Sequence, residues 1–391
     1  MTSVLISGAS VAGPALAYWL HRYGFDVTVV EKSGLIRGGG YPIDIRGTAV
    51  DVVERMGVLP QVRAAHIDTA RISVLNGAGR TIAAFRPGDI TGTRDSTDVE
   101  LPRGDLTSIL YARTRDDVEY VFGDSIATLD SHHDRVDVTF ERGGPRSFDY
   151  VVGADGLHSN TRRLAFGPER DYHRYLGCCF AGFTAPNTGG WSHEGILQNT
   201  PGRLAAIYAV GEQPWVHAML AFATPEPGRD ATGRADLVAG AFAGLGGEVP
   251  GLLGALAGAD DVYFDTVSQI RMPGWVAGRV VLVGDAAYAP SFLTGQGTSL
   301  ALAGAYVLAG ELRNGTPAAY EARMRDYVTR NQALADGGIG VLPRTRGQLW
   351  MRNQAFRLLP LLARADLIGR DQRRAATALV LPARQDQQDV P

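Results

Sequence analysis

Near the start of the sequence stands the stretch VLISGASVAG at Val4–Gly13, followed by an apolar segment up to Tyr23 and by VTVVE at Val27–Glu31. The two short apolar runs are typical of buried parallel strands, and the segment between them has room for a helix of about a dozen residues. The order strand, tight turn, helix, strand predicts a βαβ unit. The rest of the chain is interpreted outward from this unit, as an α/β fold.

The residues of the turn indicate what this unit binds. Gly8 frees the turn from Cβ hindrance, and Gly13 lets the helix approach the sheet. The start of the helix then offers unpaired N–H groups to a pyrophosphate, and the hydroxyl of Ser10, which stands in place of a second glycine, can donate to it. Glu31 lies 23 residues beyond Gly8, where a carboxylate accepts both hydroxyls of an adenosine ribose. We expect a dinucleotide here; the alternative is an ordinary βαβ unit.

Composition limits the classes of protein to consider. The chain has 391 residues, 45% hydrophobic and 20% charged, enough for two domains or a little more. A formal net charge of -3, spread along the chain, argues against a nucleic-acid partner. The only cysteines, Cys178 and Cys179, are adjacent and cannot form a disulfide framework, which favours a cytoplasmic location. The first strand begins by Val4, which leaves no room for a signal peptide, and no apolar run is long enough to span a membrane.

The pattern of short runs divides the chain into regions. Residues 1–175 and 271–330 read as one discontinuous domain, and residues 331–391 read as C-terminal helices. Between them, residues 176–270 show short alternating runs typical of an antiparallel sheet with one covered face, interrupted by a helical stretch at Arg234–Leu256. We expect this middle region to be a second domain inserted in the first.

Three motifs then stand in a fixed order: GASVAG with Glu31, GADG at residues 153–156, and GDAAYAPSFLTGQG at residues 284–297. This combination resembles the single-component FAD-dependent aromatic hydroxylases, with the para-hydroxybenzoate hydroxylase fold. It is most similar to tetracycline-hydroxylating monooxygenases and to actinomycete monooxygenases of natural-product tailoring. The resemblance implies a Rossmann-like FAD-binding domain, an inserted antiparallel-sheet substrate domain and C-terminal helices.

The resemblance also assigns roles to residues. It gives Glu31 the ribose of FAD and Asp285 the ribityl chain or pyrophosphate. Arg103 matches an arginine on the ribityl side of the flavin, and Asp44 matches an acid beside the flavin. Arg37 matches an arginine assigned to the nicotinamide cofactor or the flavin. The residues expected to bind the cofactor are Gly8, Ser10, Ala12, Gly13, Glu31, Lys32, Arg37, Asp44, Arg103, Asp155, Gly284, Asp285, Gly295 and Gly297.

The third motif is expected to meet the flavin ring. Reduced flavin carries negative charge, which N–H groups at the start of a helix from Thr298 would stabilise, while Gly295 and Gly297 let the ring lie against the backbone. Phe292 stands where the family commonly has a proline, and Tyr288 replaces a usual histidine at a position we expect to be structural. The candidates for the flavin face are Phe292, Gly295 and Gln296; no other catalytic residue and no metal cluster is indicated.

The implied reaction is hydroxylation of an aromatic or polyketide-type substrate by O2. NAD(P)H would reduce FAD, and a flavin C4a-hydroperoxide would pass its distal oxygen to an electron-rich carbon. Three alternatives stay open: a flavin oxidase or dehydrogenase, a redox-silent FAD-containing cyclase, which Phe292 allows, and a plain nicotinamide dehydrogenase. The protein is expected to act as a monomer or homodimer on a polycyclic small molecule.

Overall fold

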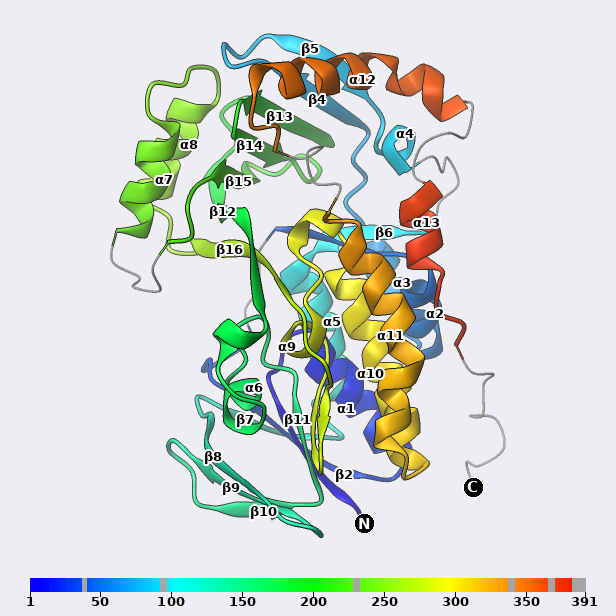
Figure 1. Ribbon diagram of the computed structural model, residues 1–391. Helices are drawn as coiled ribbons and strands as arrows, with labels where there is room; N and C mark the ends of the chain where they lie inside the picture. The colour runs from blue at the N-terminus through cyan, green and yellow to red at the C-terminus, as the bar shows by residue number, and fades with distance from the viewer. Residues whose placement is uncertain (37–40, 92–96, 228–232, 337–341, 365–369, 382–391) are drawn as a thin grey trace.

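A computed structural model gives the structure of the protein. It describes residues 1–36, 41–91, 97–227, 233–336, 342–364 and 370–381. Two large sheets stand one above the other in Figure 1, and helices cover the outer side of each. The lower sheet carries the N-terminal motif, and the upper sheet closes over its edge.

The first sheet has six strands in the order β17-β18-β11-β1-β2-β7, all parallel except β17. Strand β1 lies inside the sheet, with β2 hydrogen-bonded on one side and β11 on the other, so the strand order changes direction at β1. This is the arrangement in which ligands bind beyond the carboxyl ends of the strands. The bounds are β1 Ser3–Ser7, β2 Asp26–Glu31, β7 Glu119–Phe122, β11 Tyr150–Gly153, β17 Val276–Ala277 and β18 Val280–Leu282.

The register of this sheet brings the three motifs together. Ser7 at the end of β1 pairs with Gly153 at the end of β11, and Gly153 pairs with Leu282 at the end of β18. Because the strands are parallel, the turns that follow them open at the same edge. The predicted α/β class and the strand-turn-helix-strand unit are therefore confirmed.

One face of the first sheet is covered by helices. Among these helices, α10 packs against both α1 and α11, and its apolar residues are almost all buried. The other face meets a small antiparallel sheet of β8, β9 and β10. The bounds are α1 Ala12–Arg22, α5 Arg103–Thr114, α6 Asn160–Ala165, α9 Asp285–Tyr288, α10 Gly297–Arg313, α11 Pro317–Ala333, β8 Ile126–Ser131, β9 Val136–Phe140 and β10 Arg146–Phe148.

The second sheet has seven strands in the order β16-β12-β15-β14-β13-β4-β5. It is antiparallel except where β13 pairs in parallel with β4. Residues 71–85 therefore belong to this sheet, and their assignment to the first domain was wrong. The hairpin itself was predicted. Its pairing with β13 was not, because local sequence pattern does not predict contacts between segments far apart in the chain. The bounds are β4 Arg71–Leu75, β5 Thr81–Phe85, β12 His173–Pro186, β13 Glu194–Thr200, β14 Arg203–Tyr208, β15 Trp215–Ala223 and β16 Tyr263–Ile270.

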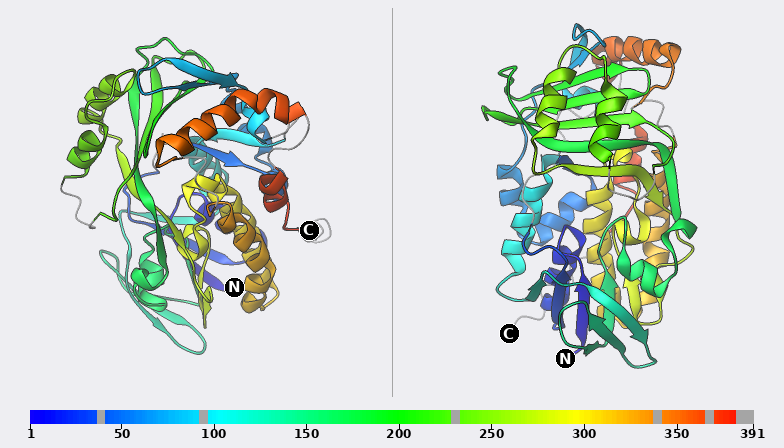
Figure 2. Two further views of the ribbon diagram at one scale, coloured as in Figure 1. Left: turned by 45° about the horizontal axis from the view of Figure 1, so that its top comes forward. Right: turned by 90° about the vertical axis from the view of Figure 1, so that its left-hand side faces the viewer.

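Helices also cover the second sheet (Figure 2). The helical stretch predicted at Arg234–Leu256 is two helices, α7 Arg234–Phe242 and α8 Val249–Ala257. The chain turns between them at Gly244 and Gly247, which both have positive φ, so a single helix was wrong here.

The C-terminal helices do not form one unit. Helix α12 (Arg346–Arg364) lies along β5 of the second sheet, whereas α13 (Arg370–Ala376) packs on α11 of the first domain. The described helices of the expected C-terminal segment, residues 331–391, thus pack on different sheets. Among the described residues, none of the helices has the length and apolar character needed to cross a membrane.

A two-stranded antiparallel ribbon of β3 (Pro42–Ile45) and β6 (Val99–Pro102) lies between the start of α10 and the second sheet. Its apolar side chains point into the core of the first domain, to which helices α2 and α3 also contribute, whereas α4 contacts α12 and α13. The bounds of these are α2 Thr48–Arg55, α3 Leu59–Ala64 and α4 Pro87–Thr91, and single 3-10 turns occur at Glu169–Asp171 and Phe292–Thr294.

The fit of α1 to β1 depends on Gly13, because a Cβ there would lie 1.9 Å from the carbonyl oxygen of Gly8. We predict that Gly13→Ala lowers the free energy of unfolding by at least about 1–3 kcal/mol, the usual cost of overpacking. Urea denaturation measures the change. The matched control is Gly310→Ala in α10, which has open space around it and should be stabilised by about 0.4–1 kcal/mol. Equal effects of the two changes would contradict the close approach.

Candidate functional site

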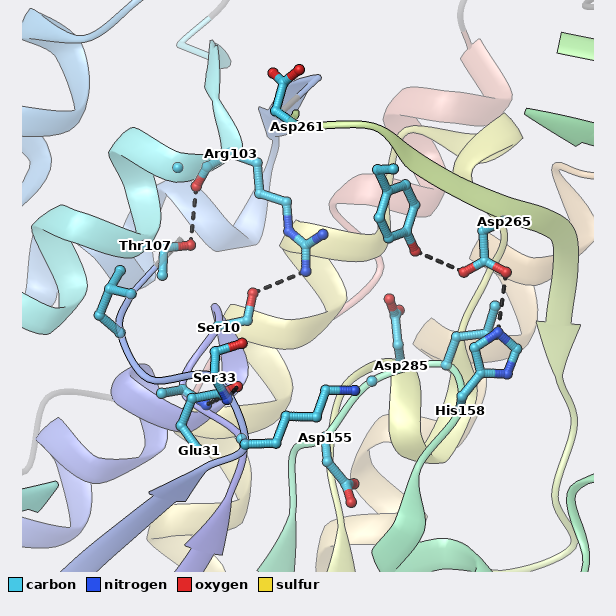
Figure 3. A pocket seen from close by; sticks show the side chains of 18 of the residues that line it. Ser10, Glu31, Ser33, Arg103, Thr107, Asp155, His158, Asp261, Asp265 and Asp285 are labelled. Carbon is cyan, nitrogen blue, oxygen red and sulfur yellow. Dashed lines mark hydrogen bonds and ion pairs between the residues drawn. The ribbon is translucent and has the colours of Figure 1, made fainter. Parts of the chain in front are cut away.

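The carboxyl edge of the first sheet opens onto a cavity of about 810 Å³ (Figure 3). Its walls come from the turns after β1, β2 and β11, from the start of α5, and from β16 of the second sheet. Several residues predicted to bind a cofactor lie on these walls: Gly8, Ser10, Glu31, Lys32, Arg103, Asp155 and Asp285. Segments that lie far apart in the sequence, from Ser7 to Asp285, therefore meet in one cavity.

The turn that follows β1 is held by close backbone contacts. Gly8 has φ 108°, and a Cβ there would lie 2.6 Å from the carbonyl oxygen of Ala154, so the turns after β1 and β11 touch. Gly284 also has positive φ, and a Cβ there would lie 3.2 Å from the Cβ of Ala12. Ala12, Gly13 and Gly284 thus pack behind the cavity wall and shape the turn.

A basic corner forms beside the start of α1. Arg103, the first residue of α5, donates from Nη2 to the hydroxyl of Ser10 at 3.0 Å. Asp285 lies on the same cavity; its burial raises the pKa of its carboxyl, and the nearby charge of Arg103 lowers it. A guanidinium, a hydroxyl and the free N–H groups of a helix start are together suited to a phosphate.

The carboxylate of Glu31 is fixed in place by the backbone. Oε2 accepts from the N–H of Ala9, and Oε1 accepts from the N–H of Ser33, both at 2.9 Å. These bonds tie the turn after β1 to the loop after β2. A carboxylate has about four acceptor positions, so it retains capacity for a ribose hydroxyl. The ribose contact itself stays a prediction.

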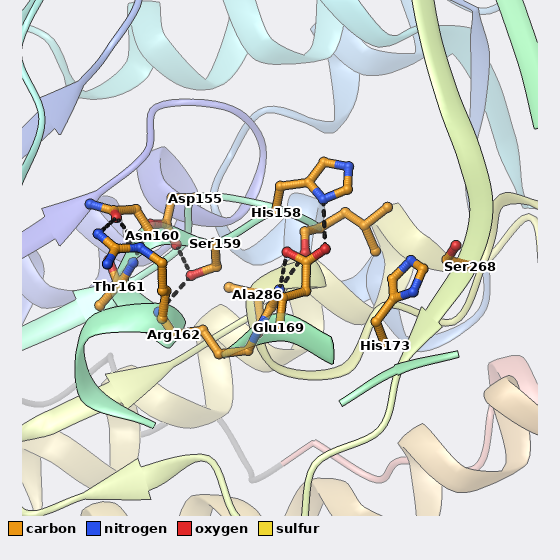
Figure 4. A network of polar contacts seen from close by, with 12 residues as sticks. Asp155, His158, Ser159, Asn160, Thr161, Arg162, Glu169, His173, Ser268 and Ala286 are labelled. Atoms are coloured by element: carbon orange, nitrogen blue, oxygen red, sulfur yellow. Dashed lines mark hydrogen bonds and ion pairs between the residues drawn. The ribbon is translucent and has the colours of Figure 1, made fainter. Parts of the chain in front are cut away.

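Asp155 has a structural role in the turn after β11 (Figure 4). Its carboxylate accepts from the N–H and hydroxyl of Thr161, both at 2.9 Å, and from the hydroxyl of Ser159, which is the N-cap of α6. The side chain is thereby directed to the start of the helix. Its contact with the cofactor stays a prediction.

His158 is a site residue that sequence reasoning missed. Its Nε2 bonds to Asp265 at 3.1 Å and its Nδ1 to Glu169 at 2.9 Å, and these two bonds raise the pKa of the imidazole to about 9 (Figures 3 and 4). The imidazolium links the first domain to β16, where Tyr263 also donates to Asp265 at 2.7 Å. The proximity of His158 to the GADG motif was the available signal, but Asp265 lies 107 residues away in the chain.

The two ends of the third motif lie close together, because Gly297 packs near Asp285. A Cβ on Gly297 would lie 3.7 Å from Oδ1 of Asp285, and one on Gly295 would lie 3.0 Å from Oδ2 of Asp44. Between them, Gln296 is fully buried, and within the described part of the chain its side-chain amide has no hydrogen-bond partner. A buried unpaired amide costs about 1–3 kcal/mol, which a bound polar ligand would relieve. Glycines at a helix start and an unpaired amide fit a flat ring with polar edges.

Phe292 packs against the second sheet. Its ring lies 4.7 Å from that of Phe180, which also contacts Tyr41 and Tyr263. Tyr288, in contrast, is buried away from this cluster, and its hydroxyl bonds to that of Tyr320 at 2.7 Å. The expectation that Tyr288 is structural is confirmed.

Three further points of the sequence analysis concern Arg37, the two cysteines and a metal site. Arg37 lies outside the described residues. Cys178 and Cys179 are buried and unpaired with each other. Within the described ranges, no group of three or more His, Cys, Asp and Glu side chains is arranged to hold a metal ion.

Comparison with known proteins adds to this geometry. Residues 1–337 match the family model described as FAD binding domain. An uncharacterised protein of Mycobacterium tuberculosis is 43% identical over 351 residues, which cover 87% of this chain and 94% of the relative. A flavin-dependent monooxygenase from an unknown prokaryotic organism is 41% identical over 340 residues, which cover 85% of this chain and 88% of the relative.

Solved structures agree. The crystal structure of tetracycline destructase Tet(55) is 36% identical and superimposes with a TM-score of 0.83 over 97% of this chain and 98% of that chain. The predicted resemblance is confirmed over nearly the whole length. The chain therefore belongs to the FAD-binding family of flavin-dependent monooxygenases.

Proposed function

We propose that this monooxygenase hydroxylates an aromatic or polyketide-type small molecule with O2, using NAD(P)H as reductant, in natural-product tailoring or antibiotic modification. The observation that carries the proposal is the convergence of Ser10, Arg103 and Asp285 on one cavity. This cavity lies at the carboxyl edge of the first sheet, and the second sheet covers it. The relatives named flavin-dependent monooxygenase and tetracycline destructase support the reaction type and the substrate class.

The residues present fit an extended FAD. Glu31 would hold the adenosine ribose, and the corner of Ser10 and Arg103 would hold the pyrophosphate. Asp285 would accept from the ribityl hydroxyls, and the backbone at Gly295–Gly297 would support the ring. When bound, FAD supplies the redox chemistry between NAD(P)H and O2, which no protein side chain can supply.

The protein's own contribution to the ring is electrostatic. Helix α10 has 17 residues, and its first turn begins at Gly297 without a side-chain cap. Its unpaired N–H groups would stabilise negative charge on the ring by roughly 0.3–1 kcal/mol, or up to about 2 in a partly buried geometry. This stabilisation would favour the reduced form of the cofactor.

The inner face of the second sheet would form the roof over the substrate. It presents a cluster of apolar and aromatic side chains toward Phe292 and Leu293 of the first domain, and these include Phe180, Leu197, Leu204, Ala206, Tyr208 and Met219. Such a roof excludes water from the reacting centre. It also matches the flat, apolar body of an aromatic substrate.

We predict that the purified protein, supplied with NAD(P)H and a polycyclic phenol under an 18O2 atmosphere, inserts one labelled oxygen atom into the product. Mass spectrometry of the product measures the label. An unlabelled oxidised product would indicate an oxidase or dehydrogenase instead. Turnover that needs neither NAD(P)H nor O2 would indicate a redox-silent cyclase.

We predict that Asp285→Ala purifies without FAD and that Arg103→Ala retains less FAD than the wild type, because each removes a polar group from the same cavity. The ratio of flavin absorbance to protein absorbance measures occupancy. Arg113→Ala is the matched control, since Arg113 lies exposed on the same helix, α5, and stacks on Tyr18. If Asp285→Ala were as yellow as the wild type, the proposed role of Asp285 would be wrong.

We predict that Phe292→Pro changes the product or the coupling of NAD(P)H oxidation to hydroxylation more than it changes FAD content. The reason is that Phe292 contacts the roof through Phe180 rather than the cavity around Ser10. Product analysis and the ratio of product formed to NAD(P)H consumed measure the effect. Unchanged product and coupling would remove Phe292 from the substrate site.

A further inference from the structure

Two acidic side chains face each other on the ribbon of β3 and β6. Asp44 and Glu100 are direct partners in the antiparallel register. Their neighbours Ile43 and Leu101 point into the core of the first domain. Because side chains alternate along a strand, Asp44 and Glu100 both project from the opposite face, with their Cβ atoms about 4.5–5.5 Å apart.

The opposite face of the ribbon lies near Gly295 of the third motif and near Tyr208 of the second sheet. On one side, Oδ2 of Asp44 lies 3.0 Å from the position that a Cβ on Gly295 would take. On the other, Tyr208 of β14 comes from the roof; burial raises the pKa of its phenol, and the charges of Glu100 and Asp44 raise it further. The acidic pair therefore lies between the glycines of the third motif and the roof.

Among the described residues, Arg46 is the cation that acts on both acids. Arg46, two residues beyond Asp44 on the same strand end, places Nη2 3.0 Å from Oδ2 of Asp44, and the two side chains are 18% and 24% exposed. The other titratable groups around Glu100 are Tyr208 from the roof, Asp98 just before β6, and His66, which bonds to the backbone of Glu100. The carboxyl group of Glu100 has no hydrogen-bond partner among the described residues.

The burial of Glu100 and the negative charge of Asp44 beside it decide whether the carboxyl group of Glu100 is protonated. Burial, and next the charge of Asp44, raise the pKa of Glu100 to about 8, while Arg46 opposes the shift. With a pKa of about 8, the carboxyl group of Glu100 is mostly protonated at neutral pH, and Asp44 forms its ion pair with Arg46. Such a pair offers one hydrogen-bond donor and one acceptor side by side, and the donor lacks a partner.

We propose that Asp44 and Glu100 bind the substrate, with Glu100 donating to a carbonyl oxygen and Asp44 accepting from a neighbouring hydroxyl. This inference rests on the proposed function, since it places the substrate between the flavin ring and the roof. The ligand class is an aromatic or polyketide ring that carries a hydroxyl beside a ketone. A ring without these groups would leave buried polar atoms unpaired, so the site discriminates against it.

The protonation of Glu100 is tested without cofactor or substrate, by the melting temperature as a function of pH. An unfolded glutamate has a pKa of about 4.3, so between about pH 5 and pH 8 the folded protein holds a proton that the unfolded chain has released. Stability therefore falls as pH rises through this range. Glu100→Gln should remove that part of the fall and be more stable than the wild type at about pH 8.5.

Two further variants complete this test. Glu54→Gln, at an exposed position of α2, is the matched control and should keep the wild-type pH profile. Asp44→Asn should also weaken the fall, because it removes the charge that repels the Glu100 carboxylate. Wild-type profiles in both Glu100→Gln and Asp44→Asn would overturn the shared proton.

Substrate binding is tested with the FAD-loaded protein in the absence of NAD(P)H, using perturbation of the flavin spectrum to measure Kd. The probe is 1-hydroxyxanthone, whose hydroxyl lies beside its ketone, and the control ligand is 1-methoxyxanthone. Because binding requires the protonated acid, the wild type should bind the probe about tenfold more weakly at pH 9 than at pH 6. Glu100→Gln should abolish this pH dependence.

Equal affinity for the methyl ether, or no binding of the probe at either pH, would overturn the assigned ligand class. An unchanged pH dependence in Glu100→Gln would overturn the role of Glu100. These measurements need no turnover, so they are independent of the oxygen-labelling experiment. Loss of label with normal pH-dependent binding would reject the hydroxylation and keep the acidic pair.

Discussion

The parallel alignment of β1, β11 and β18 is the constraint on which the site depends. Their last residues are register partners, so the three turns that follow must open at one edge. No single turn makes a cofactor site. Together they bring the start of α1, the loop with His158, and Asp285 onto one cavity, which the start of α5 completes with Arg103.

Close packing keeps these turns in place. Contacts without room for a Cβ occur where Gly8 meets the loop after β11 and where Gly13 meets Gly8. Polar contacts then connect the parts: Glu31 is tied to the backbone of the turn, and His158 joins the first domain to β16. The arrangement leaves charged groups on the cavity wall, and it leaves the amide of Gln296 without a protein partner within the described residues.

Local sequence pattern was sufficient for the N-terminal βαβ unit of the first domain, but not for the bounds of that domain. Gly8, Gly13 and Glu31 predicted the βαβ unit, and the resemblance carried by the three motifs predicted a common site. Local sequence pattern could not predict the features that depend on contacts between distant segments. The docking of β4 on β13, the pairing of His158 with Asp265, and the opposition of Asp44 and Glu100 all depend on register between segments far apart in the chain. Glu100 in particular carries no motif, and only its strand partner marks it as unusual.

We infer that segments far apart in the chain bind one FAD molecule, with the adenine end near Glu31 and the ring near Gly295. Hydrogen–deuterium exchange with and without added FAD tests it most directly. We predict that the turn at residues 8–13, the start of α5 and residues 295–298 are protected together, with the same dependence on FAD concentration. Protection of the N-terminal turn alone, or at different FAD concentrations for the separate segments, would contradict the claim.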